Sequence, residues 1–165
     1  MKLSTDLDNI DIIILSLVQK EGRLPLTIIA EKVGLSTPAA SERLKKLEER
    51  GVISGYFAKL TGLQLGLDIT AFVEVRVDSS SHYKSFIKQV LAKNEILDCH
   101  AITGNASHLL KIKTKNTATL EKLLSDIQRW QGVVKSQTSL VLSTHKETLS
   151  LPLEFVKETI IDRNK

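Results

Sequence analysis

The sequence predicts an α+β protein of two parts, a helical N-terminal part and a C-terminal part in which strands alternate with helices. Apolar residues recur at helical spacing as far as residue 50, and their period changes to two after residue 68. Between the two parts, residues 61–68 contain two glycines and no clear periodicity, so we expect a hinge there. The length of 165 residues suits one domain or two small ones.

The composition excludes several classes of protein. Hydrophobic residues make up 42% of the chain and charged residues 25%, which is ordinary for a folded protein and unlike disordered or low-complexity chains. No apolar stretch approaches the roughly 18 residues that a membrane span needs, and the N-terminus does not resemble a signal peptide, so we expect a cytoplasmic protein. Cys99 is the only cysteine, which excludes an intrachain disulfide. The net charge of +4 is mild; it permits a nucleic-acid partner without requiring one.

Three short helices are predicted in the N-terminal part. The first spans 7–18, where apolar residues fall on one side of a helix, and the second spans 26–33. The third spans 37–50, because Ser36 is a good N-cap and Gly51 suits the position just after a helix end.

A two-stranded wing is expected next, with strands at 52–53 and 56–60. Three helices followed by such a ribbon indicate a winged helix-turn-helix, which we place in residues 1–60. An α-helix fits the major groove of B-DNA, and residues near the N-terminus of the third helix would reach the base edges.

The face of the third helix opposite its apolar stripe supplies the predicted DNA contacts. Small side chains at its start allow close approach to the bases, and the basic side chains of Arg43, Lys46 and Lys59 are assigned to phosphates. A plain three-helix packing unit with a solvated charged face remains the alternative, because nearby glutamates weaken the basic patch. The predicted DNA-binding residues are Ser36, Thr37, Pro38, Ala39, Ser41, Arg43, Lys45, Lys46 and Lys59.

The C-terminal part, residues 69–150, shows the order βαββαβ, which is the ferredoxin-like arrangement. A short helix is expected within the tail, residues 151–165. A ferredoxin-like sheet has one helix-covered face and one open face, so we expect Phe72 on the open face to support self-association as a homodimer. The predicted strands are 69–77, 96–103, 108–114 and 133–143, and the predicted helices lie around 86–91 and 120–127.

Several motifs resemble those of the Lrp/AsnC, or feast/famine, regulators. They include Leu7-Asp8-x-x-Asp11-x-x-Ile14-Leu15, Gly22-Arg23, Val33-Gly34-Leu35-Ser36, Gly51-Val52-Ile53-x-Gly55-Tyr56 and Ala101-Ile102-Thr103-Gly104. The resemblance covers nearly the whole chain and implies a transcription regulator. Its N-terminal winged helix-turn-helix would bind double-stranded DNA. Its C-terminal domain, of the RAM or ACT type, would form dimers, assemble them into tetramers or octamers, and bind an amino-acid effector.

The turn from Gly104 to Ser107 is the candidate effector site. Glycine permits close backbone approach, and the side chains of Asn105 and Ser107 offer hydrogen bonds, although the same residues also suit a plain hairpin loop. Many family members carry acidic residues in this turn. This chain lacks them, so we expect a weak or different effector, or none. The resemblance assigns the other wall of the site to Gln128, Thr138 and Ser139 of a neighbouring subunit.

No constellation of residues indicates catalysis. The four histidines are scattered, and no phosphate-binding loop, dinucleotide fingerprint, zinc-protease or nucleophile-elbow motif occurs. We therefore predict a protein that is not an enzyme and has no metal or cofactor. The alternative function is a metabolite-sensing protein that acts through protein partners, and salt-dependent retention on DNA would distinguish it from a DNA-binding regulator.

Overall fold

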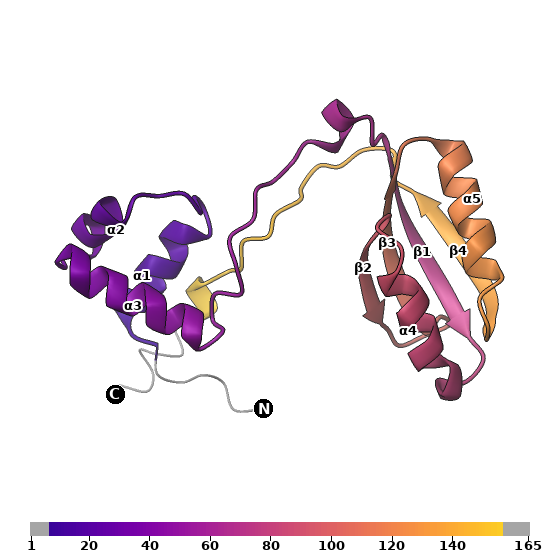
Figure 1. Ribbon diagram of the computed structural model, residues 1–165, viewed down its shortest axis with the longest axis horizontal. Helices are drawn as coiled ribbons and strands as arrows, with labels where there is room; N and C mark the ends of the chain where they lie inside the picture. Colours follow the sequence, from indigo (N-terminus) through magenta and orange to yellow (C-terminus); the bar gives the residue numbers. More distant parts are fainter. Residues whose placement is uncertain (1–6, 157–165) are drawn as a thin grey trace. The chain divides into compact units, whose positions relative to one another are not determined.

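The computed structural model describes residues 7–156, which form two compact units (Figure 1). The first unit contains residues 7–59 together with 147–156, and the second contains residues 60–146. The chain therefore leaves the first unit after Lys59 and returns to it at Glu147. Two chain segments connect the units.

The predicted helices of the first unit are present, with bounds close to those expected. They are α1 (Asn9–Val18), α2 (Leu26–Val33) and α3 (Thr37–Glu49). The Asp8 side chain caps α1 in a reciprocal capping box, and the Ser36 hydroxyl caps α3 by accepting from a backbone N–H. These caps satisfy N–H groups that have no partner inside their helices, which explains why the helices begin where they do.

One apolar cluster holds the three helices together. Its buried members come from every helix of the unit, so the position of α3 is set by packing against α1 and α2. Ala40 and Leu47 are buried as the helical spacing predicts, and Leu44 is half-buried. The opposite side of α3 is thereby left on the surface. The buried members of the cluster are Ile12, Ile14, Leu15, Ile29 and Leu47.

The wing expected over 52–60 is not formed, because these residues contain no strand. The N–H groups of Val52 and Ile53 both donate to the carbonyl of Leu47, at 2.9 and 3.2 Å, so the end of α3 occupies the donors that a ribbon would need. The Tyr56 hydroxyl donates to the Glu48 carboxylate at 2.8 Å. Burial and this carboxylate raise the pKa of Tyr56 to about 12, so the hydroxyl keeps its proton and ties the segment to α3.

The returning segment packs onto the first unit. Gln19 uses its whole amide: Nε2 donates to the Leu151 carbonyl at 3.2 Å, and Oε1 accepts from the Leu151 N–H at 3.0 Å. Leu153 and Val156 pack against the apolar cluster of the helices. Residues 154–156 are helical, and the remainder of the expected C-terminal helix lies outside the described residues.

The second unit is a four-stranded antiparallel sheet in the order β2-β3-β1-β4, with two helices (Figure 1). This confirms the predicted βαββαβ arrangement. The second and fourth strands are shorter than expected, and the expected hinge includes a 3₁₀ helix, Gly62–Leu65. The elements are β1 (Ile69–Val77), α4 (Tyr83–Leu91), β2 (Ile96–Ala101), β3 (His108–Thr114), α5 (Thr117–Gln128) and β4 (Val133–Leu140).

The sheet buries one face beneath α4 and α5. Alternate residues of β1, from Ala71 to Val77, are buried there with Phe86 of α4 and Ile127 of α5. Phe72 lies on the opposite face, and its side chain is 39% exposed. None of the helices in the described part of the chain has the length and apolar character that a bilayer span needs.

Candidate DNA-binding helix and effector turn

The surface of α3 carries most of the predicted DNA-binding residues. Thr37, Pro38, Ser41 and Lys45 are exposed, and Ala39 is half-buried. The Ser36 hydroxyl accepts from the Ala39 N–H at 3.4 Å and so caps the N-terminus of the helix that presents these side chains. The N-terminal half of this face consists of small side chains, which allow a DNA groove to approach the backbone closely.

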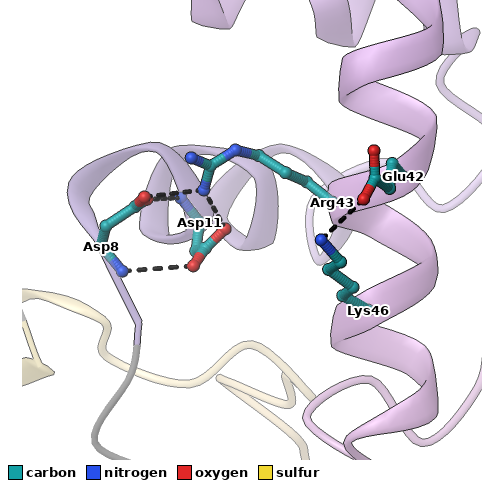
Figure 2. Close-up of polar contacts among 5 residues, drawn as sticks. All are labelled: Asp8, Asp11, Glu42, Arg43 and Lys46. Atoms are coloured by element: carbon teal, nitrogen blue, oxygen red, sulfur yellow. Dashed lines mark hydrogen bonds and ion pairs between the residues drawn. The ribbon is translucent and has the colours of Figure 1, made fainter.

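Two lysines of α3 form ion pairs along the helix. Lys45 Nζ lies 3.6 Å from Glu49 Oε1. Lys46 Nζ lies 2.7 Å from Glu42 Oε1, as Figure 2 shows. The hydrogen bond from Lys46 holds the pKa of Glu42 below its ordinary value. All four side chains are largely exposed, so these pairs exchange readily with solvent. A phosphate that binds either lysine must compete with its glutamate.

Arg43 does not share this exposed surface. Its Nη1 lies 2.7 Å from Asp8 Oδ2 and 2.9 Å from Asp11 Oδ1, so the guanidinium joins α3 to the capping box of α1 (Figure 2). The hydrogen bonds to Asp8 and Asp11 raise the pKa of Arg43. Burial acts to raise the pKa of Asp8, but the Asp11 N–H and the Arg43 guanidinium outweigh it and lower that pKa.

The ion pairs of Arg43 with Asp8 and Asp11 line an open recess of about 340 Å³. Three acidic and three basic side chains line it, so it presents no single sign of charge to a ligand. From the sequence, Arg43 was assigned to phosphate, and its partners Asp8 and Asp11 were not expected. The spacing of Asp8 and Asp11 does carry the capping-box signal at the sequence level. The lining residues are Asp8, Asp11, Ala39, Glu42, Arg43, Lys46, Leu47 and Arg50.

Lys59 lies at the exit from the first unit. Its Nζ donates to the carbonyl of Glu147 at 3.0 Å, so it joins the departing and returning segments. The residue is exposed, and its ammonium group retains donors for a further partner such as a phosphate.

The candidate effector turn connects β2 to β3. Gly104 and Asn105 are exposed, and Gly104 has φ of +113°, a conformation that side chains with a Cβ rarely adopt. Ser107 differs, because its hydroxyl is bonded within the chain. Its Oγ accepts from the Val77 N–H at 3.0 Å and lies 3.1 Å from the Val75 carbonyl oxygen.

The residues assigned to the other wall are not gathered within one chain. Gln128, at the end of α5, donates from Nε2 to the Ser136 hydroxyl at 3.2 Å. Thr138 and Ser139 are neighbours on β4 and therefore point to opposite faces. Thr138 pairs with Val73 on the helix-covered face, and Ser139 pairs with Phe72 on the open face.

The described residues contain no group of three or more His, Cys, Asp or Glu side chains that could hold a metal ion. Cys99 is half-buried on β2, and burial raises the pKa of its thiol. A thiol with a raised pKa is a poor nucleophile at neutral pH.

Comparison with known proteins agrees with both units. Residues 7–54 match a family model described as winged helix-turn-helix DNA-binding, and residues 70–151 match one described as the Lrp/AsnC ligand binding domain. The chain is 34% identical over 148 residues to the HTH-type transcriptional regulator FL11 of Pyrococcus furiosus, covering 90% of this chain and 97% of that protein. It is 32% identical over 152 residues to the leucine-responsive regulatory protein of Escherichia coli, covering 90% and 93%.

Solved structures give the same result. A transcriptional regulator of Neisseria meningitidis, determined in complex with L-Met, superposes with a TM-score of 0.87 at 33% identity and covers 91% of this chain and 99% of its own. An AsnC family regulator of Agrobacterium tumefaciens gives a TM-score of 0.84 at 26% identity, with coverage of 90% and 99%. The chain is thus a member of the Lrp/AsnC family of transcriptional regulators.

Proposed function

We propose that this protein regulates transcription by inserting α3 into the major groove of double-stranded DNA. The exposed face of α3 carries the proposal: it begins at a capped N-terminus, is lined by small side chains, and continues into two lysines. The free N–H groups of a helix N-terminus also favour a phosphate.

The contacts divide into base-reading and phosphate-binding groups. Thr37, Ser41 and Lys45 face the groove together with Pro38 and Ala39, whereas Lys46, Lys59 and the N-terminus of α3 at Ser36 meet phosphates. Arg43 contributes by holding α3 against α1, since its ion pairs with Asp8 and Asp11 lie within the unit. A regulator that binds chromosomal DNA works in the cytoplasm of a bacterial or archaeal cell, and we include that location in the proposal.

Dimerisation through the open face of the sheet is the second part of the proposal. Phe72 is a large apolar residue on β1, an interior strand of the sheet, and is 39% exposed. Two such faces packed together form a symmetric dimer, which places two copies of α3 on two half-sites and raises the affinity through effective concentration. Further assembly to a tetramer or octamer belongs to the same proposal.

An amino-acid effector bound at the turn after β2 is the third part. It is supported by the similarity to the Neisseria regulator, whose structure contains L-Met. The exposed groups at Gly104 and Asn105 are neutral, so an amino acid held there depends on hydrogen bonds without a carboxylate partner for its ammonium group. Such bonds contribute about 0.5–1.5 kcal/mol each, which predicts weak binding. Gln128, Thr138 and Ser139 would be supplied by a neighbouring subunit.

Selection of fragmented genomic DNA on the purified protein at physiological salt tests the function. We expect a few fragments to be enriched, and Lys45→Glu to abolish their retention. Lys122→Glu, the same charge change on the exposed surface of α5, is the matched control and should retain them. Common amino acids are then added one at a time. If one of them is the effector, it should release the DNA or change the size of the protein–DNA complex. Equal, weak retention of all fragments would overturn sequence-specific binding and favour a protein partner.

A further inference from the structure

Ser107 lies where the pairing of β1 with β3 ends. The last residue pair of that ladder joins Val75 to His108, and Ser107 precedes β3. The backbone N–H of Ser107 donates to the Val75 carbonyl at 3.0 Å, and its side-chain Oγ accepts from the Val77 N–H at 3.0 Å. The hydroxyl thus replaces a backbone carbonyl and extends the ladder beyond the end of the strand.

Every polar group of Ser107 has a partner in its own chain. Its carbonyl accepts from the Ile102 N–H at 3.0 Å, which closes the turn that contains Gly104. Its Oγ meets three partners: the Val77 N–H, the Val75 carbonyl at 3.1 Å, and His108 Nδ1 at 2.9 Å. Both ends of the turn therefore meet at one residue, which is fixed to β1.

The three contacts of the hydroxyl can all be hydrogen bonds with only one neutral tautomer of His108. A serine hydroxyl has one proton to donate and two lone pairs. One lone pair accepts from Val77, and the proton goes to the carbonyl of Val75. The remaining lone pair can be used only if Nδ1 of His108 carries a hydrogen and donates it to Oγ.

The ring of His108 is held in place for this contact. Its side chain is buried, with only 2% of the residue exposed. The Tyr83 ring meets it edge-on with centroids 4.8 Å apart, and the Phe86 ring lies 4.6 Å away. A ring fixed on two sides by aromatic neighbours keeps Nδ1 directed at Ser107.

We propose that Ser107 is a positioning residue for the effector turn and that the Nδ1–H tautomer of His108 fixes its hydroxyl. The proposal rests on the proposed effector site and changes the role assigned to Ser107 there. Because its hydroxyl is fully used, an amino acid at the turn would meet the exposed groups of Gly104 and Asn105. Ser107 acts on the ligand only through the shape of the turn.

The first test needs no ligand. In long-range ¹H–¹⁵N NMR spectra of the full chain, His108 should show the Nδ1–H pattern at neutral pH. Ser107→Ala should speed hydrogen exchange of the Val77 amide about two- to twelvefold, the factor that corresponds to one hydrogen bond. Ser107→Thr keeps the hydroxyl and should restore the protection. An Nε2–H tautomer, or unchanged exchange at Val77 in Ser107→Ala, would overturn the proposal.

The second test separates positioning from contact by calorimetric titration with L-methionine and the other common amino acids. A positioning role predicts that Ser107→Ala weakens all ligands by a similar, few-fold factor and that Ser107→Thr recovers them. Asn105→Ala should instead change the order of preference. Loss of one ligand alone in Ser107→Ala, with Val77 still protected, would make Ser107 a direct contact and refute the proposal. If no amino acid binds the wild-type chain, the effector part of the proposed function fails, while the NMR result still decides the role of Ser107 in the turn.

Discussion

The Arg43 guanidinium lies 2.9 Å from the carboxylate of Asp11, a side chain that is only 9% exposed. Residues 32 apart in the sequence are thereby joined across α1 and α3. Removing one partner of such a pair leaves a charge that the surrounding protein solvates poorly.

Arg43→Ala should therefore destabilise the first unit. The pair is intermediate between exposed pairs, worth at most about 1 kcal/mol, and buried pairs that cost about 3–5 kcal/mol to break, so we expect a loss of about 2 kcal/mol. The change in the free energy of unfolding is measured by denaturant titration, with hydrogen exchange of the α1 amides as the probe of the first unit. The salt dependence of DNA binding should keep its slope. A stable variant with a smaller slope would instead identify Arg43 as a phosphate contact.

Glu42→Gln should strengthen DNA binding for every sequence tested. The substitution removes a carboxylate that holds Lys46 at 2.7 Å, which frees the ammonium for phosphate. Lys46→Ala should act in the opposite direction and lower the slope of log affinity against log salt by about one. Binding titrations at several salt concentrations measure both effects. If neither substitution changes the affinity or its salt dependence, Lys46 does not belong to the phosphate-binding group.

His108 should make the second unit less stable as the pH falls. Burial lowers its pKa below the ordinary 6.5, so the unfolded chain takes up the proton first. Its contribution to stability is complete above pH 6.5 and is lost as the pH falls from there through the folded pKa. Trp130, the only tryptophan, is 9% exposed in the core of this unit and reports its unfolding by fluorescence. The pH dependence should flatten in His108→Asn; an equal slope in both proteins would contradict this.

Sequence patterns predicted the helices and strands because their signals are local. The spacing of apolar residues, the cap at Ser36 and the glycines after helices all act within a few residues of the chain. The prediction of a wing was wrong because the N–H groups of Val52 and Ile53 donate to the end of α3 and are not available for pairing between strands. The contacts of Arg43 with α1 and of Ser107 with β1 join residues about 30 apart, and such contacts leave no periodic signal.

Leu153→Ala should destabilise the first unit, although the residue is far from α1–α3 in sequence. The side chain is half-buried against the core of α1–α3. A fully buried leucine costs about 2–5 kcal/mol on truncation, so a half-buried one should cost about 1–2 kcal/mol. Thermal unfolding of the full chain measures the change in stability. Hydrogen exchange of the α1 amides then assigns that change to the first unit. Leu142→Ala, at a side chain that is 92% exposed, should have no effect.

Phe72→Asp should dissociate the proposed dimer. A charge placed on the open face would be buried without a partner when two faces meet, and the dimer would weaken by several kcal/mol, roughly the effective penalty for an unpaired buried ion. Sedimentation velocity at micromolar concentration measures the mass. Leu142→Asp is the control, because it also replaces an apolar side chain by a carboxylate, at a residue that is 92% exposed. A variant that folds and keeps the wild-type mass would locate the self-association surface elsewhere.

The return of the chain to the first unit at Glu147 sets an order for folding during synthesis. A ribosome makes α1, α2 and α3 first. Leu151, whose backbone bonds Gln19, and Leu153, which packs on the core of the helices, emerge only after the whole of the second unit. A nascent chain stalled before Glu147 would therefore carry a helix-turn-helix without its final contacts. Competence to bind DNA is expected to arise late in translation, once the sheet has already been made.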